Sequence, residues 1–277
     1  MAYKRLTALA AALFLLLLPA VRAYGGSGQE LVGTVPRLLT ATSDRDARCT
    51  ECTMGDAVAD AMCKYLNTDI AIVCGGDFKA NLPAGDITWD ELRGAFAEDR
   101  MLATAVVSVK QLRGILEAGV SHIQMNDAER IDEPLSVYDG FPQISGFTLY
   151  YDASAPAGQR VYDIYVNDEK LDLDDGTRTF TLAATEFMLE GGYGLPGVDN
   201  AVSSGLTLAD VTARYIRDGM TEYLKTGERI HPMGTADGVL PGPAIGVIIA
   251  VSLVVFLLGR RNGRKKWNDE STYYMHM

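Results

Sequence analysis

Histidine is scarce in this 277-residue chain, which contains only three. Two of them, His122 and His231, lie ahead of the apolar stretch near the C-terminus. A two-metal hydrolytic centre needs several histidine, aspartate and asparagine ligands, and two histidines are too few to build one. The acidic segment 168–175 lacks the spacing and the terminal glutamate of a calcium loop, so we interpret it as a solvated turn. We therefore predict no metal site and no cofactor.

Basic residues are also scarce. Between residues 24 and 239 the chain has 17 lysines and arginines against 34 aspartates and glutamates. A field of that sign repels polyanions and anionic membrane surfaces, which argues against nucleic-acid binding. Any anionic ligand would need local cations, and Arg48 and Lys79 are the candidates. Internal repeats and long low-complexity tracts are absent too, so we expect one domain.

Long hydrophobic runs occur only near the two ends of the chain. Residues 1–23 combine a basic start, an apolar run and a small-residue site, which predicts a signal peptide cleaved after Ala23. A retained signal anchor is the alternative. Residues 240–259 are long and apolar enough for one transmembrane helix, and the basic start of residues 260–277 predicts a cytoplasmic tail. We predict a type I protein of the plasma membrane or another secretory-pathway membrane, with its domain outside or luminal.

Cysteine is limited to four residues in one short stretch, Cys49, Cys52, Cys63 and Cys74. The predicted signal peptide places them in an oxidising compartment, so we predict disulfides, with the pairing left open. A zinc site at Cys49 and Cys52 is the alternative, although we expect few thiolate zinc sites outside cells.

The stretch that follows Arg48 organises the rest of the chain. Its apolar residues first recur at helical spacing, and residues 69–74 then form a short apolar run that ends at Gly75 and Gly76. This pattern predicts a helix, a buried strand and a glycine turn. Because Arg48 precedes the helix and Lys79 follows the turn, both cations could stand near an anionic ligand.

Helical periodicity recurs three times after this stretch. We expect helices after Thr88, which can cap the first turn, and over residues 108–117 and 206–224. Residues 126–139 are polar and rich in turn-forming residues, so we expect them to form a surface loop.

Strand-like patterns make up most of the rest. We expect a first strand within residues 31–40. Aromatic alternation predicts three strands of a single sheet, over residues 146–151, 160–166 and 179–183. The predicted fold class is α/β, with mixed α+β layers, in one domain over residues 30–226. A stalk over residues 227–239 would connect it to the membrane.

Several segments match motifs of a known family in the same order. Arg48 and Glu51 match an R-x-x-E segment, residues 55–62 match a G-N-L-x-x-D-A-M helix, and residues 74–79 match an N-G-G-G-I-R turn. The match continues through residues 82–88, 140–146 and 186–194. On these residues the chain resembles the C-terminal, substrate-recognition domain of the 5'-nucleotidase family.

The resemblance implies an α/β domain that holds a base and phosphates, while a separate N-terminal metallophosphatase domain binds two metal ions. Only some two dozen residues separate the predicted cleavage site from Arg48, too few for that first domain. We therefore expect no catalytic residues in this chain. The resemblance implies a ligand site made of Arg48, Gly75, Gly76, Lys79, Phe187 and Tyr193.

Departures from the family pattern weaken this implied site. Cys74 replaces an asparagine, Glu98 stands where a second stacking phenylalanine belongs, and Tyr193 replaces an aspartate. Lys79 also lacks the bidentate fork of the family's arginine. Losing one stacking face costs about 1–3 kcal/mol, although Tyr193 could restore part of it. The alternative is that the glycines serve only their turns and that Phe187 belongs to the core.

The main hypothesis is a membrane-anchored recognition module linked by resemblance to nucleotide catabolism and hydrolysis. It would bind a nucleotide, nucleoside or other anion, would not be catalytic alone, and could assist a separate phosphatase chain. The alternative is a surface receptor or interaction protein that kept the fold and lost the ligand. Autonomous hydrolysis is the least favoured hypothesis, because it would require a wholly new site.

Overall fold

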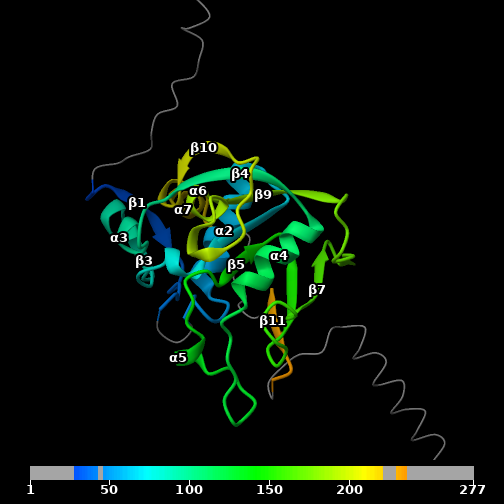
Figure 1. Cartoon of the computed structure of the whole chain (residues 1–277). Coiled ribbons are helices and arrows are strands. Elements are labelled where there is room, and N and C mark those ends of the chain that lie inside the picture. The colour runs from blue at the N-terminus through cyan, green and yellow to red at the C-terminus, as the bar shows by residue number, and fades with distance from the viewer. Residues whose placement is uncertain (1–27, 43–45, 221–228, 236–277) are drawn as a thin grey trace, which may run out of the picture.

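The computed structural model describes residues 28–42, 46–220 and 229–235, which form a mixed α/β fold (Figure 1). The predicted signal peptide, the predicted membrane span over residues 240–259 and the tail lie outside the described residues. Among the helices that are described, none is long and apolar enough to cross a membrane.

Strands and helices are interspersed along the chain, with five consecutive strands from β5 to β9. The strands are β1 (Leu31–Val35), β2 (Ile70–Cys74), β3 (Gly85–Thr88), β4 (Met101–Ser108), β5 (Pro142–Ser145), β6 (Thr148–Asp152), β7 (Val161–Val166), β8 (Glu169–Lys170), β9 (Thr179–Thr185), β10 (Val202–Thr207) and β11 (Ile230–Met233). The helices are α2 (Thr53–Leu66), α3 (Trp89–Gly94), α4 (Val109–Gly119), α5 (Glu133–Ser136), α6 (Glu186–Leu189) and α7 (Leu208–Arg217), with 3-10 turns η1 (Gly75–Asp77) and η2 (Gly192–Gly194).

A five-stranded sheet of order β10-β4-β9-β2-β5 lies at the centre. Within it β2 runs parallel to β9 and antiparallel to β5. A four-stranded sheet of order β11-β6-β7-β8 and a two-stranded sheet of β1 and β3 complete the fold. Every residue of β2 is buried, as its continuous apolar run predicts for a strand covered on both faces.

Strand β9 differs from the prediction that it shares a sheet with β6 and β7. It pairs instead with β4 along its whole length, from Leu102 opposite Thr185 to Ser108 opposite Thr179. The last four residues of β9 are all buried, so this strand needs a position with both faces covered. The central sheet provides such a position. Strand β9 therefore belongs to the central sheet and not to the smaller sheet that contains β6 and β7.

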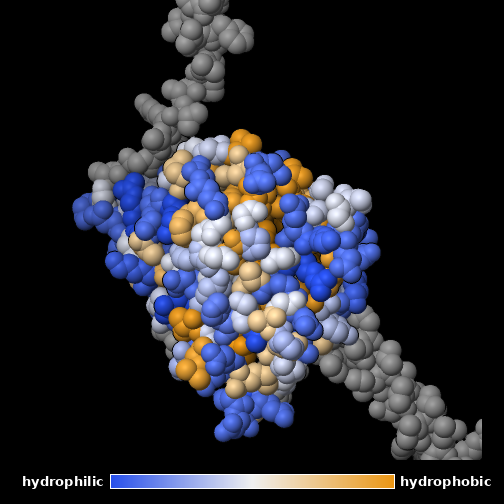
Figure 2. Space-filling model, in the orientation of Figure 1, coloured by the Kyte–Doolittle hydropathy of each residue, from blue (hydrophilic) through white to orange (hydrophobic). Residues whose placement is uncertain are grey.

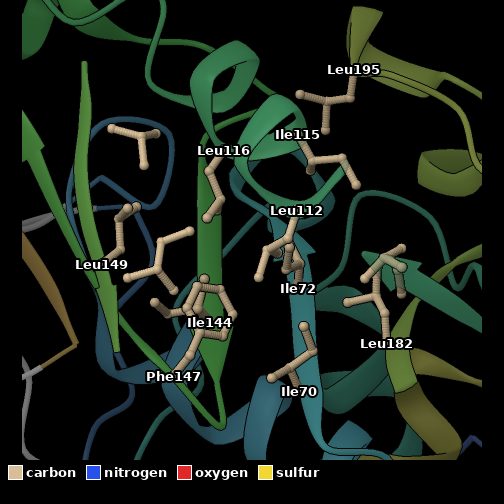
Figure 3. Packing of buried hydrophobic residues seen from close by; sticks show 14 of the residues in the cluster. Ile70, Ile72, Leu112, Ile115, Leu116, Ile144, Phe147, Leu149, Leu182 and Leu195 are labelled. Carbon is tan, nitrogen blue, oxygen red and sulfur yellow. The ribbon is translucent and has the colours of Figure 1, made fainter. Parts of the chain in front are cut away.

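Two cores flank the central sheet. On one side α2 and α7 pack together with β1 and α3. On the other side Leu112, Ile115 and Leu116 of α4 lie against Ile72 of β2 and Ile144 of β5 (Figure 3). On the face seen in Figure 2, hydrophilic residues gather mainly at the periphery, and apolar residues are exposed between them.

Helix starts follow the sequence closely. Thr88 forms a capping box at the start of α3, as predicted. Ser108 forms one at the start of α4, at the first residue of the helix predicted over residues 108–117. Thr207 does the same at α7. The predicted closing helix is shorter than expected, because α7 ends at Arg217 and is followed by Gly219 with φ 80°.

The disulfide prediction is wrong for this structure, in which all four cysteines are free thiols. Cys52 instead caps α2, its Sγ accepting a hydrogen bond from the Gly55 amide at 3.3 Å. Burial raises the pKa of Cys49 and of Cys52 to about 12, which keeps both thiols protonated and unreactive. Among the described residues, no group of three or more metal-ligating side chains would hold zinc.

The structure also differs from the predicted stalk over residues 227–239. Within it, β11 adds to the edge of β6 as a parallel strand. Arg229, just before β11, holds Asp60 of α2 through two hydrogen bonds of 2.8 and 2.9 Å. The Glu51 carboxylate accepts hydrogen bonds from the backbone amides of Arg229 and Ile230. A buried charge cluster, which composition cannot reveal, therefore fastens this segment to the domain.

Candidate functional site

The glycine turn lies where β2 ends, as predicted. The Gly75 amide donates to the Phe141 carbonyl and the Gly76 amide to the Asp139 carbonyl, both at 2.8 Å. These amides are therefore already used within the protein, and they join the turn to the end of the loop over residues 126–139. The two glycines contribute through backbone packing rather than by offering free donors to a ligand.

That packing leaves no room for a side chain. A Cβ on Gly75 would lie 2.2 Å from the Ala47 carbonyl oxygen and 2.7 Å from Arg48 Cα. A Cβ on Gly76 would lie 2.5 Å from Cβ of Asp139. The structure thus brings Arg48 and the turn together through backbone contact, which only glycine permits.

Gly75→Ala is expected to lower the free energy of unfolding by about 1–3 kcal/mol, because backbone atoms block the new methyl group. Gly114→Ala is the matched control: Gly114 lies inside α4 and nothing stands within 4 Å of its Cβ position. We expect the control to gain about 0.5–1 kcal/mol. Urea unfolding of both variants measures the difference, and equal effects would contradict the packing argument.

The two predicted cations stand in different environments. The Arg48 guanidinium is engaged with Asp46, through hydrogen bonds from Nε and Nη2 at 2.9 and 2.8 Å, and its side chain is 38% exposed. Lys79 is exposed and forms no ion pair within the described part of the chain. By contrast, Lys64 and Lys170 pair with Asp218 and Asp163. Lys79 is therefore the freer of the two charges.

Asp77, the last residue of η1, is fully buried beside the turn. Its Oδ1 lies 3.0 Å from Arg100 Nε and accepts a hydrogen bond from the Tyr193 hydroxyl, also at 3.0 Å. Its Oδ2 accepts from the Cys74 amide. Burial raises the pKa of Asp77 to about 6, although Tyr193 and Arg100 both act to lower it.

Phe187 and Tyr193 lie together, as their assignment to one site requires. Their rings meet edge to face, with centroids 4.9 Å apart. Tyr193 adopts the left-handed conformation with φ 56°, and its carbonyl accepts a hydrogen bond from the Tyr138 hydroxyl. The Arg100 guanidinium carbon stands 3.8 Å from the centre of the Phe187 ring and covers that face. Phe187 is only partly buried, so it is not simply a core residue.

Arg100 is the residue that the sequence reasoning missed. Glu98, which stands at the position of the second stacking ring, points outward with 68% of its side chain exposed and pairs with Arg100 Nη1 at 3.2 Å. Arg100 itself is only 15% exposed. An arginine two residues beyond Glu98, in a domain short of basic residues, was the available signal.

A small cavity of about 90 Å³ lies elsewhere, beside β11. Its lining includes Cys49, Glu51, Phe141 and Ile230. None of the six predicted site residues lines it. The predicted site residues accordingly lie around the turn: Arg48 contacts Gly75, and Asp77 connects the turn to Arg100 and Tyr193.

Comparison with known proteins agrees with this fold. The family model for the C-terminal domain of 5'-nucleotidases matches residues 31–200. The trifunctional nucleotide phosphoesterase protein YfkN of Bacillus subtilis is 26% identical over 193 residues, which are 67% of this chain and 12% of that protein. This chain is thus similar to a small part of a much longer relative.

Solved structures show the same fold. A 5'-nucleotidase precursor from Thermus thermophilus matches with a TM-score of 0.60 and 23% identity, over 83% of this chain and 42% of that one. The sulfate thiohydrolase SoxB of the same organism matches with a TM-score of 0.54 and 20% identity, over 76% of this chain and 36% of that one. This chain spans less than half the length of either. It belongs to the 5'-nucleotidase C-terminal domain family, which is linked to nucleotide hydrolysis.

Proposed function

We propose that this domain is a recognition module that binds a nucleotide or another phosphate-bearing anion at the turn between Gly75 and Lys79. The observation that carries the proposal is Lys79, an exposed lysine that forms no ion pair among the described residues of a strongly acidic domain. A lysine left available at a turn can bind phosphate as a point charge.

The rest of the turn supports the same chemistry. Arg48 lies against Gly75 and keeps part of its guanidinium exposed beside Asp46. The domain's overall negative field weakens any anion site, so affinity depends on these local cations and falls as salt rises. We expect weak binding, in the micromolar to millimolar range.

Lys79→Ala is expected to weaken the binding of inorganic phosphate and of AMP by about tenfold, the loss of one charge-assisted hydrogen bond. Isothermal titration calorimetry on the full chain measures both ligands. Lys110→Ala is the matched control, since Lys110 is an exposed lysine on α4 and its loss changes the net charge equally. If both variants lose affinity equally, or the unsubstituted chain binds neither ligand at millimolar concentration, the proposed site is wrong.

In this proposal a separate phosphatase chain catalyses hydrolysis, and the present domain binds the ligand for it. The support is the family's division between a recognition domain and a metallophosphatase domain, because the matched residues 31–200 correspond to the former alone. Phosphate release from AMP by the purified chain, with and without added divalent metal ions, tests this. Release above background that Lys79→Ala abolishes would overturn the division of labour.

Membrane anchoring completes the proposal, with residues 1–23 as a cleaved signal peptide and residues 240–259 as the single span. The support is the apolar character of the second segment and the basic residues that follow it. Carbonate extraction of cell membranes tests anchoring, and N-terminal sequencing of the mature chain tests cleavage after Ala23. Recovery in the soluble fraction would contradict the anchor.

A surface receptor or interaction protein is the second candidate function. The covering of the Phe187 ring by Arg100 favours it, because a family ring that no longer meets a base fits a domain that has given up its nucleotide. Chemical cross-linking on cells, followed by mass spectrometry, distinguishes the two. A reproducible protein partner in the absence of any phosphate binding would support this candidate.

A further inference from the structure

The face of Phe187 that points toward Arg100 is already occupied. The guanidinium carbon lies 3.8 Å from the ring centre, which is an ordinary stacking separation. A planar base stacks on an aromatic ring at a similar distance, so base and guanidinium compete for the same space. The backbone at Gly192 also packs closely against the Phe187 ring. A Cβ on Gly192 would lie 2.4 Å from Cδ1 and Cε1 of that ring.

Arg100 is held in this position from several directions. Asp77 pairs with its Nε at 3.0 Å and Glu98 with its Nη1 at 3.2 Å. Its own carbonyl accepts a hydrogen bond from the amide of Leu208, the first residue of α7. Moving the side chain away would leave the buried Asp77 carboxylate without its cation. The stacked arginine is therefore a built feature of the fold rather than a loose surface side chain.

We infer that Arg100 is the specificity-determining residue of the proposed site, because it occupies the base-stacking position and so selects compact phosphate anions over ligands that carry an aromatic base. This inference rests on the proposed recognition of phosphate at the turn. Arg100 acts on specificity through its position, because its guanidinium group covers a face of the Phe187 ring and excludes a base from it. Asp77 and Glu98 balance its positive charge, so the cations that would hold phosphate are those at the turn.

Adenosine is the probe that isolates the stacking position, because it carries a base and no phosphate. The unsubstituted chain is expected to bind adenosine too weakly for calorimetry at millimolar concentration. Arg100→Ala uncovers the ring and is expected to raise the affinity for adenosine by about tenfold or more. Adding Phe187→Leu to that variant should abolish the gain, since leucine fills the space but offers no ring.

Arg100→Ala also leaves Asp77 buried without a partner, which endangers folding. The double variant Asp77→Asn with Arg100→Ala removes that buried charge and opens the same ring face. Circular dichroism confirms that each variant is folded before titration. If folded variants of both kinds bind adenosine no more tightly than the unsubstituted chain, or if the unsubstituted chain itself binds adenosine, the inference is wrong.

The inference and the proposed function fail in different ways. Phosphate binding by the unsubstituted chain without any gain of adenosine binding in the two Arg100 variants overturns the role of Arg100 alone. A gain of adenosine binding in a chain that never binds phosphate overturns the proposed function and keeps Arg100 as the group that blocks the ring.

Discussion

Replacing Arg229 with methionine is expected to lower the free energy of unfolding by about 3 kcal/mol, because it removes the positive charge that lies among several buried carboxylates. Among the described residues, Arg229 pairs with Asp60 at 2.8 Å and with Asp56 at 3.9 Å. Glu51, 3% exposed, lies in the same cluster. Methionine keeps much of the aliphatic length, so the loss measures charge and hydrogen bonding rather than volume. Urea unfolding of the full chain gives the value.

The matched control is Arg113→Met, which breaks an ion pair with Asp174, 82% exposed, and a longer contact of 4.0 Å with Glu117. Exposed pairs contribute little, and we expect at most about 1 kcal/mol. A second measurement is hydrogen exchange at the Leu149 amide, which donates to the Arg229 carbonyl at 2.7 Å. Faster exchange there would locate the damage at β11. An Arg229→Met chain as stable as Arg113→Met would show that this cluster does not hold the C-terminal segment.

Asp56→Asn is expected to flatten the pH dependence of stability. Asp56 is fully buried, and burial together with the neighbouring Glu51 raises its pKa to about 8. In the unfolded chain an aspartate titrates near pH 3.9. Between these two values the folded state holds a proton that the unfolded state has lost. Raising the pH through this window therefore removes stability, by up to about 1.4 kcal/mol per pH unit.

The asparagine variant has no titrating carboxyl group at this position. Its free energy of unfolding should therefore exceed that of the unsubstituted chain at about pH 8 and approach it near pH 4–5. It also restores the residue that the motif G-N-L-x-x-D-A-M has at this position. Urea unfolding across this pH range, followed by the fluorescence of the buried Trp89, measures the difference. Asp77, whose pKa is also raised, makes the stability of both chains fall with rising pH below about pH 6. The effect of Asp56 is therefore the difference between the two pH profiles. Parallel pH profiles would rule out a protonated Asp56.

Local sequence patterns predicted much of the fold. A continuous apolar run became β2, and hydroxyl residues ahead of amphipathic segments began α3 and α4. Such elements depend on interactions within a few residues, which a sequence displays directly. The pairing of strands does not depend on such local interactions. Strand β9 joins β4 and β2 because its last residues must be covered on both faces, and that choice is made between segments far apart in the chain.

The candidate site divides in the same way. The glycine turn, Phe187 and Tyr193 were named from the family's motifs; in the structure Tyr193 donates a hydrogen bond to Asp77 beside the turn, and its ring meets that of Phe187. Arg100 was not predicted, since its role depends on a ring almost ninety positions later that stacks on it in three dimensions. The glycine amides were expected near a ligand, yet they bind the carbonyls of Asp139 and Phe141.

By itself the sequence determined the family, the α/β class, the acidic character and the position of the turn, because each depends on composition or on short motifs. Only the tertiary structure decided that the cysteines stay apart as free thiols, that β11 belongs to the domain, and that Arg100 covers Phe187. Those outcomes depend on which distant segments come into contact when apolar surface is buried and buried charges must find partners.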